Sequence, residues 1–204
     1  MATALLICNG EKPKKWLKKW AQKADFILAA DGGADGALAA GVTPDAVIGD
    51  LDSASPRAQK LLAQVPFLHV KRQDNTDLEK ALDWLVLQKF DECLIVGATG
   101  GRLDFTLGNF LSVYPYLDKI KLTFIGQKWH IFPLTRSFVF SARKGARMSL
   151  IPLRDCKNIT LKGVKYRLNR ADWQLGQTGL SNEITAKKTE VLFDSGYMLM
   201  YLEN

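Results

Sequence analysis

The stretch FILAADGGADGAL, residues 26–38, contains an apolar run, a glycine-rich turn and the start of a helical pattern. Five apolar residues (26–30) are followed at once by the turn DGG (31–33), and small apolar residues then recur at helical spacing over 33–40. A buried strand that leads through a short turn into a helix is the repeating unit of α/β proteins. The stretch therefore predicts one such unit at the start of a larger α/β sheet.

The same alternation of apolar runs and amphipathic helical patterns extends over residues 1–126. Because strands that are apolar throughout are buried on both faces, it predicts a parallel sheet covered by helices on both sides. Thr76 with Glu79 predicts a capping box before the fourth helix, and Gly41 is placed to end the second helix. The expected strands span residues 4–8, 26–30, 45–49, 67–70, 92–97 and 121–126, and the expected helices span residues 13–24, 33–40, 56–64, 77–89 and 104–114.

The pattern changes after residue 126. Short β-rich segments such as RSFVFSA (136–142) are separated by turn residues, and no helical pattern of useful length is present. This arrangement predicts an all-β sandwich or barrel. The expected fold class is therefore α/β plus all-β: a parallel, Rossmann-like α/β sheet domain over residues 1–126, followed by a β-sandwich domain over residues 127–204.

The composition narrows the class of protein. The chain has 204 residues, 47% of them hydrophobic and 24% charged, and no apolar run approaches the roughly 20 residues that a membrane-spanning helix needs. The three cysteines, Cys8, Cys93 and Cys156, lie far apart in apolar segments, which indicates free thiols and a cytoplasmic protein.

The net charge of +7 is unevenly distributed along the sequence. Residues 1–126 contain 15 Lys and Arg against 15 Asp and Glu, whereas residues 127–204 contain 13 against 6. This asymmetry suggests that the two parts have different roles.

Four polar clusters follow four of the expected strands. Because ligands bind at the carboxyl ends of the strands in open parallel sheets, we expect the clusters to converge on one edge of the sheet. The clusters are Asp31, Gly32 and Gly33; Asp50, Asp52 and Ser53; Asp74, Asn75, Thr76 and Asp77; and Thr99, Gly100, Gly101, Arg102 and Asp104.

These residue types suit one kind of chemistry. Carboxylates at one edge repel one another unless a cation lies between them, and Mg²⁺ prefers one or two carboxylates together with substrate phosphates. Glycine turns at helix starts bring backbone N–H groups close to an anion, and an arginine pairs with phosphate through two hydrogen bonds. The set predicts a metal-dependent phosphoryl or nucleotidyl transfer, although neither G-x-x-x-x-G-K-[ST] nor G-x-G-x-x-G is present.

The ordered segments ADGGADGAL, PDAVIGDLDS, QDNTDLEKAL and GATGGRLDFTLGN resemble those of the bacterial thiamine pyrophosphokinase (thiamine diphosphokinase) family. The later segments TGLSNEI and FDSGYMLMYL resemble its C-terminal β domain. The resemblance implies an enzyme that transfers the pyrophosphate group of ATP to the hydroxyl of thiamine, giving thiamine diphosphate and AMP. It also implies Mg²⁺ as cofactor and a homodimer that shares the thiamine site between its subunits.

The resemblance also implies roles for individual residues. Asp77 or Asp74 would accept the proton of the thiamine hydroxyl, and the choice between them stays open. Asp35 departs from the uncharged polar residue that is more usual in the family. Trp173 is a second candidate beside Tyr166 for an aromatic face against thiamine. The implied catalytic residues are Asp50, Asp52, Asp77 and Arg102; the metal ligands are Asp50, Asp52 and Asp77; the ATP-binding residues are Asp31, Gly32, Gly33, Ser53, Thr99, Gly100, Gly101, Arg102 and Asp104; and the substrate-binding residues are Asp74, Thr76, Asp77, Tyr166, Ser181 and Asn182.

Two other functions are compatible with the residues. A Mg²⁺-dependent pyrophosphokinase for another small alcohol would have the same metal and phosphate residues. A nucleic-acid-binding protein with a structural metal site would use the basic C-terminal part, but the aromatic residues there do not form a regular ladder of stacking positions. Neither a membrane nor a nucleic acid is therefore the expected partner.

Overall fold

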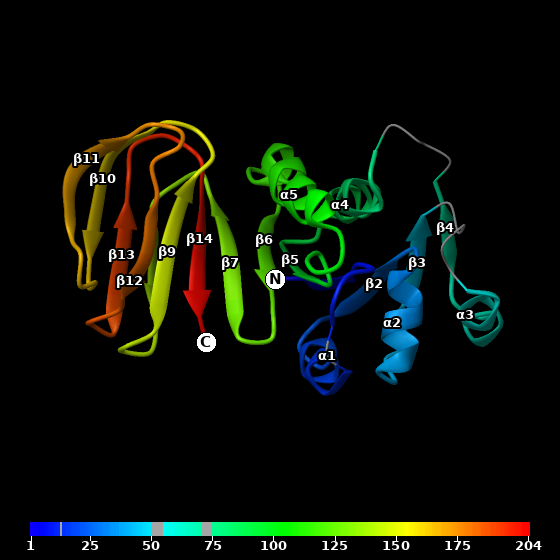
Figure 1. The fold of residues 1–204 in the computed structure, drawn as a ribbon. Coiled ribbons are helices and arrows are strands. Elements are labelled where there is room, and N and C mark those ends of the chain that lie inside the picture. The colour runs from blue at the N-terminus through cyan, green and yellow to red at the C-terminus, as the bar shows by residue number, and fades with distance from the viewer. Residues whose placement is uncertain (13, 50–54, 71–74) are drawn as a thin grey trace. The chain divides into compact units, whose positions relative to one another are not determined.

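The computed structural model of the chain describes residues 1–12, 14–49, 55–70 and 75–204. These residues form two compact units, Met1–Gln127 and Lys128–Asn204 (Figure 1). Within the described residues, strands occur in both units and helices only in the first, which confirms the mixed α and β content predicted from the sequence.

The first unit contains a parallel sheet whose strands lie in the order β6-β5-β1-β2-β3-β4. The chain adds strands outward from β1 to β4 and then returns to the other side of β1 with β5. The strand order therefore reverses between β1 and β5, at a topological switch point. The strands are β1 (Thr3–Ile7), β2 (Phe26–Ala30), β3 (Ala46–Gly49), β4 (Phe67–His69), β5 (Glu92–Val96) and β6 (Lys121–Ile125).

Helices cover both faces of this sheet (Figure 1). Leu17 of α1 and Ala37 of α2 pack in one apolar cluster with Leu5 of β1. On the other face, Trp84 of α4 stacks on Phe26 of β2, with ring centroids 5.4 Å apart. The helices are α1 (Lys14–Ala21), α2 (Gly33–Ala39), α3 (Pro56–Leu61), α4 (Asp77–Leu87) and α5 (Leu103–Ser112), and a 3-10 turn, η1 (Tyr114–Tyr116), follows α5.

The predicted helix-end signals are confirmed. The capping box joins Thr76 and Glu79 in both directions, and Gly41 follows α2 with φ +66°, a conformation that glycine adopts without strain. The expected strands agree with the structure to within one residue at each end. The helix expected at residues 13–24 is shorter, because its last turn closes through a tighter bond from Lys23 N to Trp20 O.

The second unit consists of antiparallel strands in two groups, ordered β12-β9-β14-β7 and β11-β10-β13-β8. Both groups contribute to one apolar core, for example through Met148 and Met200 from the first and Ile159 and Val191 from the second. The strands are β7 (Trp129–Leu134), β8 (Phe138–Ser141), β9 (Arg147–Pro152), β10 (Cys156–Lys162), β11 (Leu168–Trp173), β12 (Gly179–Glu183), β13 (Lys188–Leu192) and β14 (Met198–Glu203).

Two glycines of the first unit should respond oppositely to alanine. A Cβ on Gly33 would overlap the Ile7 carbonyl oxygen, whereas a Cβ on Gly108, inside α5, would meet no atom within 4 Å. We expect Gly108→Ala to raise the free energy of unfolding by about 0.5–1 kcal/mol, because alanine loses less backbone entropy in a helix. We expect Gly33→Ala to lower it by more than about 2 kcal/mol.

Urea unfolding of both variants and of the wild type measures these differences. Equal stability of the Gly33→Ala variant and the wild type would contradict the close approach of α2 to β1.

Candidate active site

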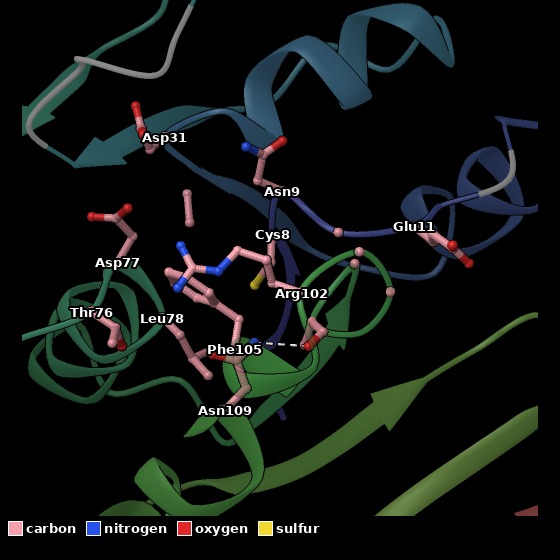
Figure 2. Close-up of a pocket in the computed structure, with 16 residues that line it drawn as sticks. Cys8, Asn9, Glu11, Asp31, Thr76, Asp77, Leu78, Arg102, Phe105 and Asn109 are labelled. Carbon is pink, nitrogen blue, oxygen red and sulfur yellow. Dashed lines mark hydrogen bonds between the residues drawn. The ribbon is translucent and has the colours of Figure 1, made fainter. Parts of the chain in front are cut away.

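A pocket of about 610 Å³ lies in the first unit, at the switch point of the sheet. It is bordered by the segments that follow β1, β2 and β5 and by the first turns of α4 and α5. Figure 2 shows side chains from these separate elements gathered around it. The lining residues are Cys8, Asn9, Gly10, Glu11, Ala30, Asp31, Thr76, Asp77, Leu78, Gly97, Ala98, Gly100, Gly101, Arg102, Phe105 and Asn109.

Strand register brings these segments together. Ile7 of β1 is paired with Ala29 of β2 on one side and with Val96 of β5 on the other, so the three strands end at the same level. Beyond β1 the backbone stays bonded to the segment after β5, through Gly10 N to Gly97 O (2.6 Å) and Glu11 N to Thr99 O (2.8 Å). The floor of the pocket is therefore backbone held by hydrogen bonds.

The sequence clusters reach the pocket only in part. Asp31, Thr76, Asp77, Gly100, Gly101 and Arg102 line it. Gly32, Thr99 and Asp104 lie next to lining residues in the chain without lining the pocket themselves, and Gly33 lies two positions after the lining residue Asp31. Asp50, Asp52, Ser53 and Asp74 lie outside the described residues.

Asp31 follows β2 directly and so lies at the carboxyl edge of the sheet (Figure 2). Asp31 is only 4% exposed, and its backbone has φ +43°. The Asp31 amide donates to Ile48 O at 2.8 Å, which ties this left-handed residue to the end of β3. A residue other than glycine held in this conformation, with a buried carboxyl beside a pocket, is typical of a functional position.

The glycine pairs differ in their structural reasons. A Cβ on Gly32 would overlap the Asn9 side chain, and Gly33 packs on the end of β1, so this pair allows α2 to approach β1 closely. Gly100 and Gly101 instead have φ +92° and +67°, conformations that favour glycine in the turn before α5.

Among the described residues that line the pocket, Arg102 is the one with a positively charged side chain. Its Nε donates to Asp104 Oδ1 at 3.1 Å, and its guanidinium lies 4.5 Å from the centre of the Phe105 ring. The paired carboxylate raises the pKa of Arg102, and the same hydrogen bonds lower the pKa of Asp104. Asp104 thus orients Arg102 in the arrangement without ligand, and the guanidinium stays charged at the pocket rim.

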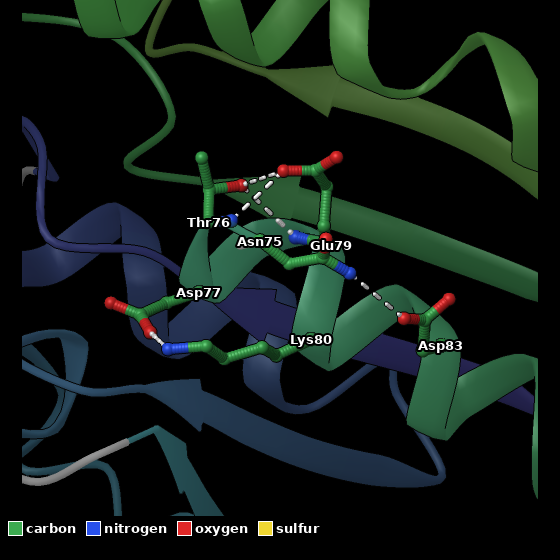
Figure 3. Close-up of polar contacts among 6 residues, drawn as sticks. All are labelled: Asn75, Thr76, Asp77, Glu79, Lys80 and Asp83. Atoms are coloured by element: carbon green, nitrogen blue, oxygen red, sulfur yellow. Dashed lines mark hydrogen bonds and ion pairs between the residues drawn. The ribbon is translucent and has the colours of Figure 1, made fainter. Parts of the chain in front are cut away.

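The first turn of α4 is held by its own side chains (Figure 3). Glu79 N donates to Thr76 Oγ1 at 3.3 Å, and Thr76 N donates to Glu79 Oε2 at 2.9 Å. Lys80 Nζ lies 2.9 Å from Asp77 Oδ1. Thr76 therefore caps the helix, and Asp77 enters the pocket from a fixed turn.

The segment after β1 is the main part of the pocket that the sequence prediction missed. Cys8, Asn9, Gly10 and Glu11 all line the pocket, and Lys12 Nζ donates to Gly10 O at 2.7 Å. Asn-Gly directly after the first strand is itself a turn signal at a carboxyl end, so the rule used for the other strands could have found it.

Phe105 and Asn109, on the exposed side of α5, were also missed. The Asn109 side chain donates to Ala98 O at 2.8 Å, which ties α5 to the segment after β5. An apolar ring on a helix gives no sequence signal that separates a site from a core. Asp35 does not line the pocket: its carboxylate accepts hydrogen bonds from the backbone and hydroxyl of Ser55, before α3.

Three of the predicted substrate-binding residues, Tyr166, Ser181 and Asn182, lie in the second unit. Asn182 is buried, and its amide exchanges hydrogen bonds with the backbone of Tyr166: Tyr166 N to Oδ1 (3.0 Å) and Nδ2 to Tyr166 O (2.8 Å). Tyr166 is 62% exposed and borders a small cavity of about 190 Å³ that Trp173 and Asn182 also line. Ser181 is exposed with φ +59°, and its amide donates to Ser149 Oγ.

The donor set fits a hard metal ion in part. Asp31 and Asp77 both line the pocket, and carboxylate oxygens are the ligand type that Mg²⁺ prefers. Within the described ranges no group of three or more His, Cys, Asp or Glu side chains is arranged to hold a metal.

The described helices include none that is both long and apolar enough to cross a membrane.

A switch-point pocket with carboxylates, an arginine and glycine turns is typical of α/β enzymes that bind phosphorylated ligands. Comparison with known proteins gives the family. Residues 17–124 match the family described as thiamin pyrophosphokinase, catalytic domain, and residues 138–198 match thiamin pyrophosphokinase, vitamin B1 binding domain. The chain therefore belongs to the thiamine pyrophosphokinase family and is a transferase.

Individual relatives agree with this assignment. The chain is 34% identical to thiamine pyrophosphokinase of Bacillus subtilis over 181 residues, 85% of each chain. The crystal structure of thiamine pyrophosphokinase from Bacillus subtilis superposes with a TM-score of 0.89 at 29% identity, over 99% of both chains. The corresponding enzyme from Geobacillus thermodenitrificans gives a TM-score of 0.86 at 25% identity, over 100% of this chain and 98% of that one. A first unit of helices and parallel strands and a second unit of antiparallel strands are thus the fold of known members of the family.

Cys8 lines the pocket but should not react as a nucleophile. Burial raises the pKa of its thiol to about 12, from an ordinary value of 9.0, and burial also raises the pKa of Cys93 and Cys156. At pH 8 the thiolate fraction of Cys8 is then about 10³-fold smaller than that of an ordinary cysteine. We expect iodoacetamide to leave Cys8 unmodified in the folded protein, as measured by peptide mass spectrometry.

The same protein unfolded in guanidinium chloride is the control, and all three cysteines should react there. Rapid alkylation of Cys8 in the folded protein at pH 8 would contradict the assigned burial and pKa.

Proposed function

We propose that the protein transfers the pyrophosphate group of ATP to the hydroxyl of thiamine, giving thiamine diphosphate and AMP, with Mg²⁺ as cofactor. Membership of the thiamine pyrophosphokinase family supports the reaction. The observation that carries the proposal is the switch-point pocket, which Asp31, Asp77 and Arg102 line from three elements.

ATP binds in this pocket through backbone and charge. Arg102 lies at the start of α5, where free backbone N–H groups and the helix dipole favour an anion. Gly100 and Gly101 keep the preceding turn free of side chains. Arg102 pairs with the phosphates and, on doing so, exchanges part of its bonding to Asp104 for bonding to phosphate oxygens. Gly32, Gly33, Ser53 and Thr99 complete the ATP-binding set in this proposal.

The metal ligands in this proposal are Asp50, Asp52 and Asp77. Asp77 lines the pocket, and Asp50 and Asp52 come after β3 in the sequence. β3 pairs with β2, the strand that Asp31 follows. When bound, Mg²⁺ neutralises charge on the phosphates and aligns them for displacement.

The chain's own residues position the displacement and move one proton. The thiamine oxygen forms a bond to the β-phosphorus as the bond from that phosphorus to the oxygen of the departing AMP breaks. The hydroxyl proton passes to a nearby carboxylate, Asp77 or Asp74. Asp31 and Arg102 fix the nucleotide so that the acceptor can approach in line.

The two units divide the work in this proposal. Residues 1–126 form a Rossmann-like catalytic domain for Mg²⁺ and ATP. Residues 127–204 form a β-sandwich domain that contacts thiamine and another subunit of a homodimer, in the cytoplasm. Tyr166 offers an exposed aromatic face that suits the charged thiazolium ring, and Asn182 holds its backbone in place.

Release of AMP from ATP, with and without thiamine, tests the function. We expect AMP only when thiamine and Mg²⁺ are both present, and we expect Asp50→Asn to abolish it while the thermal unfolding temperature changes little. A panel of other small alcohols checks the acceptor. Turnover of another alcohol in preference to thiamine would contradict the proposal, and so would an unchanged rate in Asp50→Asn.

Arg102 and Asp104 should contribute unequally. Arg102→Met removes a charge that meets the phosphates, so we expect kcat/KM for ATP to fall by about 10²-fold or more. Asp104→Asn leaves the arginine in place and should cost less than about tenfold, because Asp104 acts only by orienting it. Steady-state AMP formation measures both variants. A larger loss in Asp104→Asn than in Arg102→Met would contradict these roles.

A further inference from the structure

Lys80 is a buried cation beside the pocket. Its side chain is 5% exposed. Among the lysines and arginines that the structure describes, Lys80 is the one that is buried. Burying an ammonium group costs free energy unless a negative partner and hydrogen bonds compensate it. Lys80 therefore needs a negative partner in the folded protein, which a surface lysine does not need.

Lys80 forms an ion pair with a residue of the pocket. Lys80 Nζ lies 2.9 Å from Asp77 Oδ1 across one helical turn, and Asp77 is 37% exposed and lines the pocket. Figure 3 shows one Asp77 oxygen directed at Lys80 and the other directed away from it. Lys80 itself is not among the described lining residues. Lys80 therefore contacts a pocket residue, Asp77, without lining the pocket itself.

The surrounding turn makes this contact rigid. The capping box of Thr76 and Glu79 fixes the backbone on which Asp77 begins α4, and Lys80 N donates to Thr76 O at 2.9 Å. Backbone and side chain are therefore both held before any ligand binds. Such preorganisation matters where a carboxylate must be placed to within a fraction of an ångström.

We propose that Lys80 is a positioning residue for the pyrophosphate transfer: it holds Asp77 so that its second carboxylate oxygen faces the pocket, and it offsets the Asp77 charge that would otherwise repel the ATP phosphates. This inference rests on the proposed function. It assigns to the lysine a role in the reaction without contact with either substrate.

The test is a double-mutant cycle of Lys80→Met and Asp77→Asn, read out by calorimetric binding of Mg·ATP without thiamine and by kcat. Methionine keeps the length and apolar stem of lysine while removing its charge. We expect Lys80→Met to lower kcat by about 10²-fold, with less than a twofold change in KM for thiamine. We expect it to weaken ATP binding at least fivefold when Asp77 is present and less than twofold when residue 77 is asparagine.

Lys119→Met is the matched control. Lys119 is exposed and contacts the ring of Tyr116, whose hydroxyl donates to Asp83 of α4, so it adjoins the same helix away from the pocket. It should retain wild-type kcat and ATP affinity. Thermal unfolding is measured for every variant, and Lys80→Gln replaces Lys80→Met in the cycle if the methionine variant does not fold.

Two results would overturn the inference. Wild-type kcat and ATP affinity in a folded Lys80 variant would reduce the lysine to a structural role. An equal loss of ATP binding with and without Asp77 would mean that Lys80 acts independently of it. AMP formation by the wild-type protein with thiamine is measured alongside. If the wild type makes no AMP, the proposed function is wrong; if it does, either result above counts against the role of Lys80 alone.

Discussion

The pairing of β1 with β2 on one side and β5 on the other is the constraint on which the site depends. Ile7 lies level with Ala29 and with Val96, so the chain leaves three neighbouring strands at one height. Because the strands are parallel, the segments that follow them all lie at the carboxyl edge of the sheet. The strand order reverses between β1 and β5, so no crossover connection covers the segments after these two strands. A one-residue shift of β1 would move Leu5 to the opposite face of the sheet, away from its cluster with Leu17, and would move the Asn9–Gly10 turn away from Gly97.

Packing at this edge and charge within it support each other. Gly33 lets the start of α2 touch the end of β1, which a side chain would prevent, and this close contact fixes the turn that carries Asp31. Carboxylates gathered in this way need positive partners. Arg102 at the rim and Lys80 behind Asp77 supply them from the protein itself. An anionic nucleotide with its metal ion would add to a network that already balances part of its charge.

The sequence predicted the sheet well because apolar runs, capping signals and glycine turns are local features. The capping box at Thr76 and the left-handed Gly41 are examples that depend only on neighbouring residues. The edge of the sheet was also predictable, since it follows from parallel strands. What the sequence lacked was information on partners distant in the chain: the amide of Asn182 holds Tyr166, and Asp35 holds Ser55. Phe105 was missed because an aromatic residue on a helix gives the same sequence signal in a core and in a site, whereas the rule for carboxyl ends of strands could have found Asn9.

The central claim is that the switch-point pocket binds ATP, and a titration of the ¹⁵N-labelled protein with Mg·ATP, followed by amide chemical shifts, tests it most directly. The account predicts that the largest shifts occur at the amides of residues 8–11, Asp31, Asp77 and residues 97–102. It also predicts small shifts at amides in the core of the second unit, such as Met148 and Met200. Shifts concentrated in the second unit, with the amides around the pocket unchanged, would contradict the account.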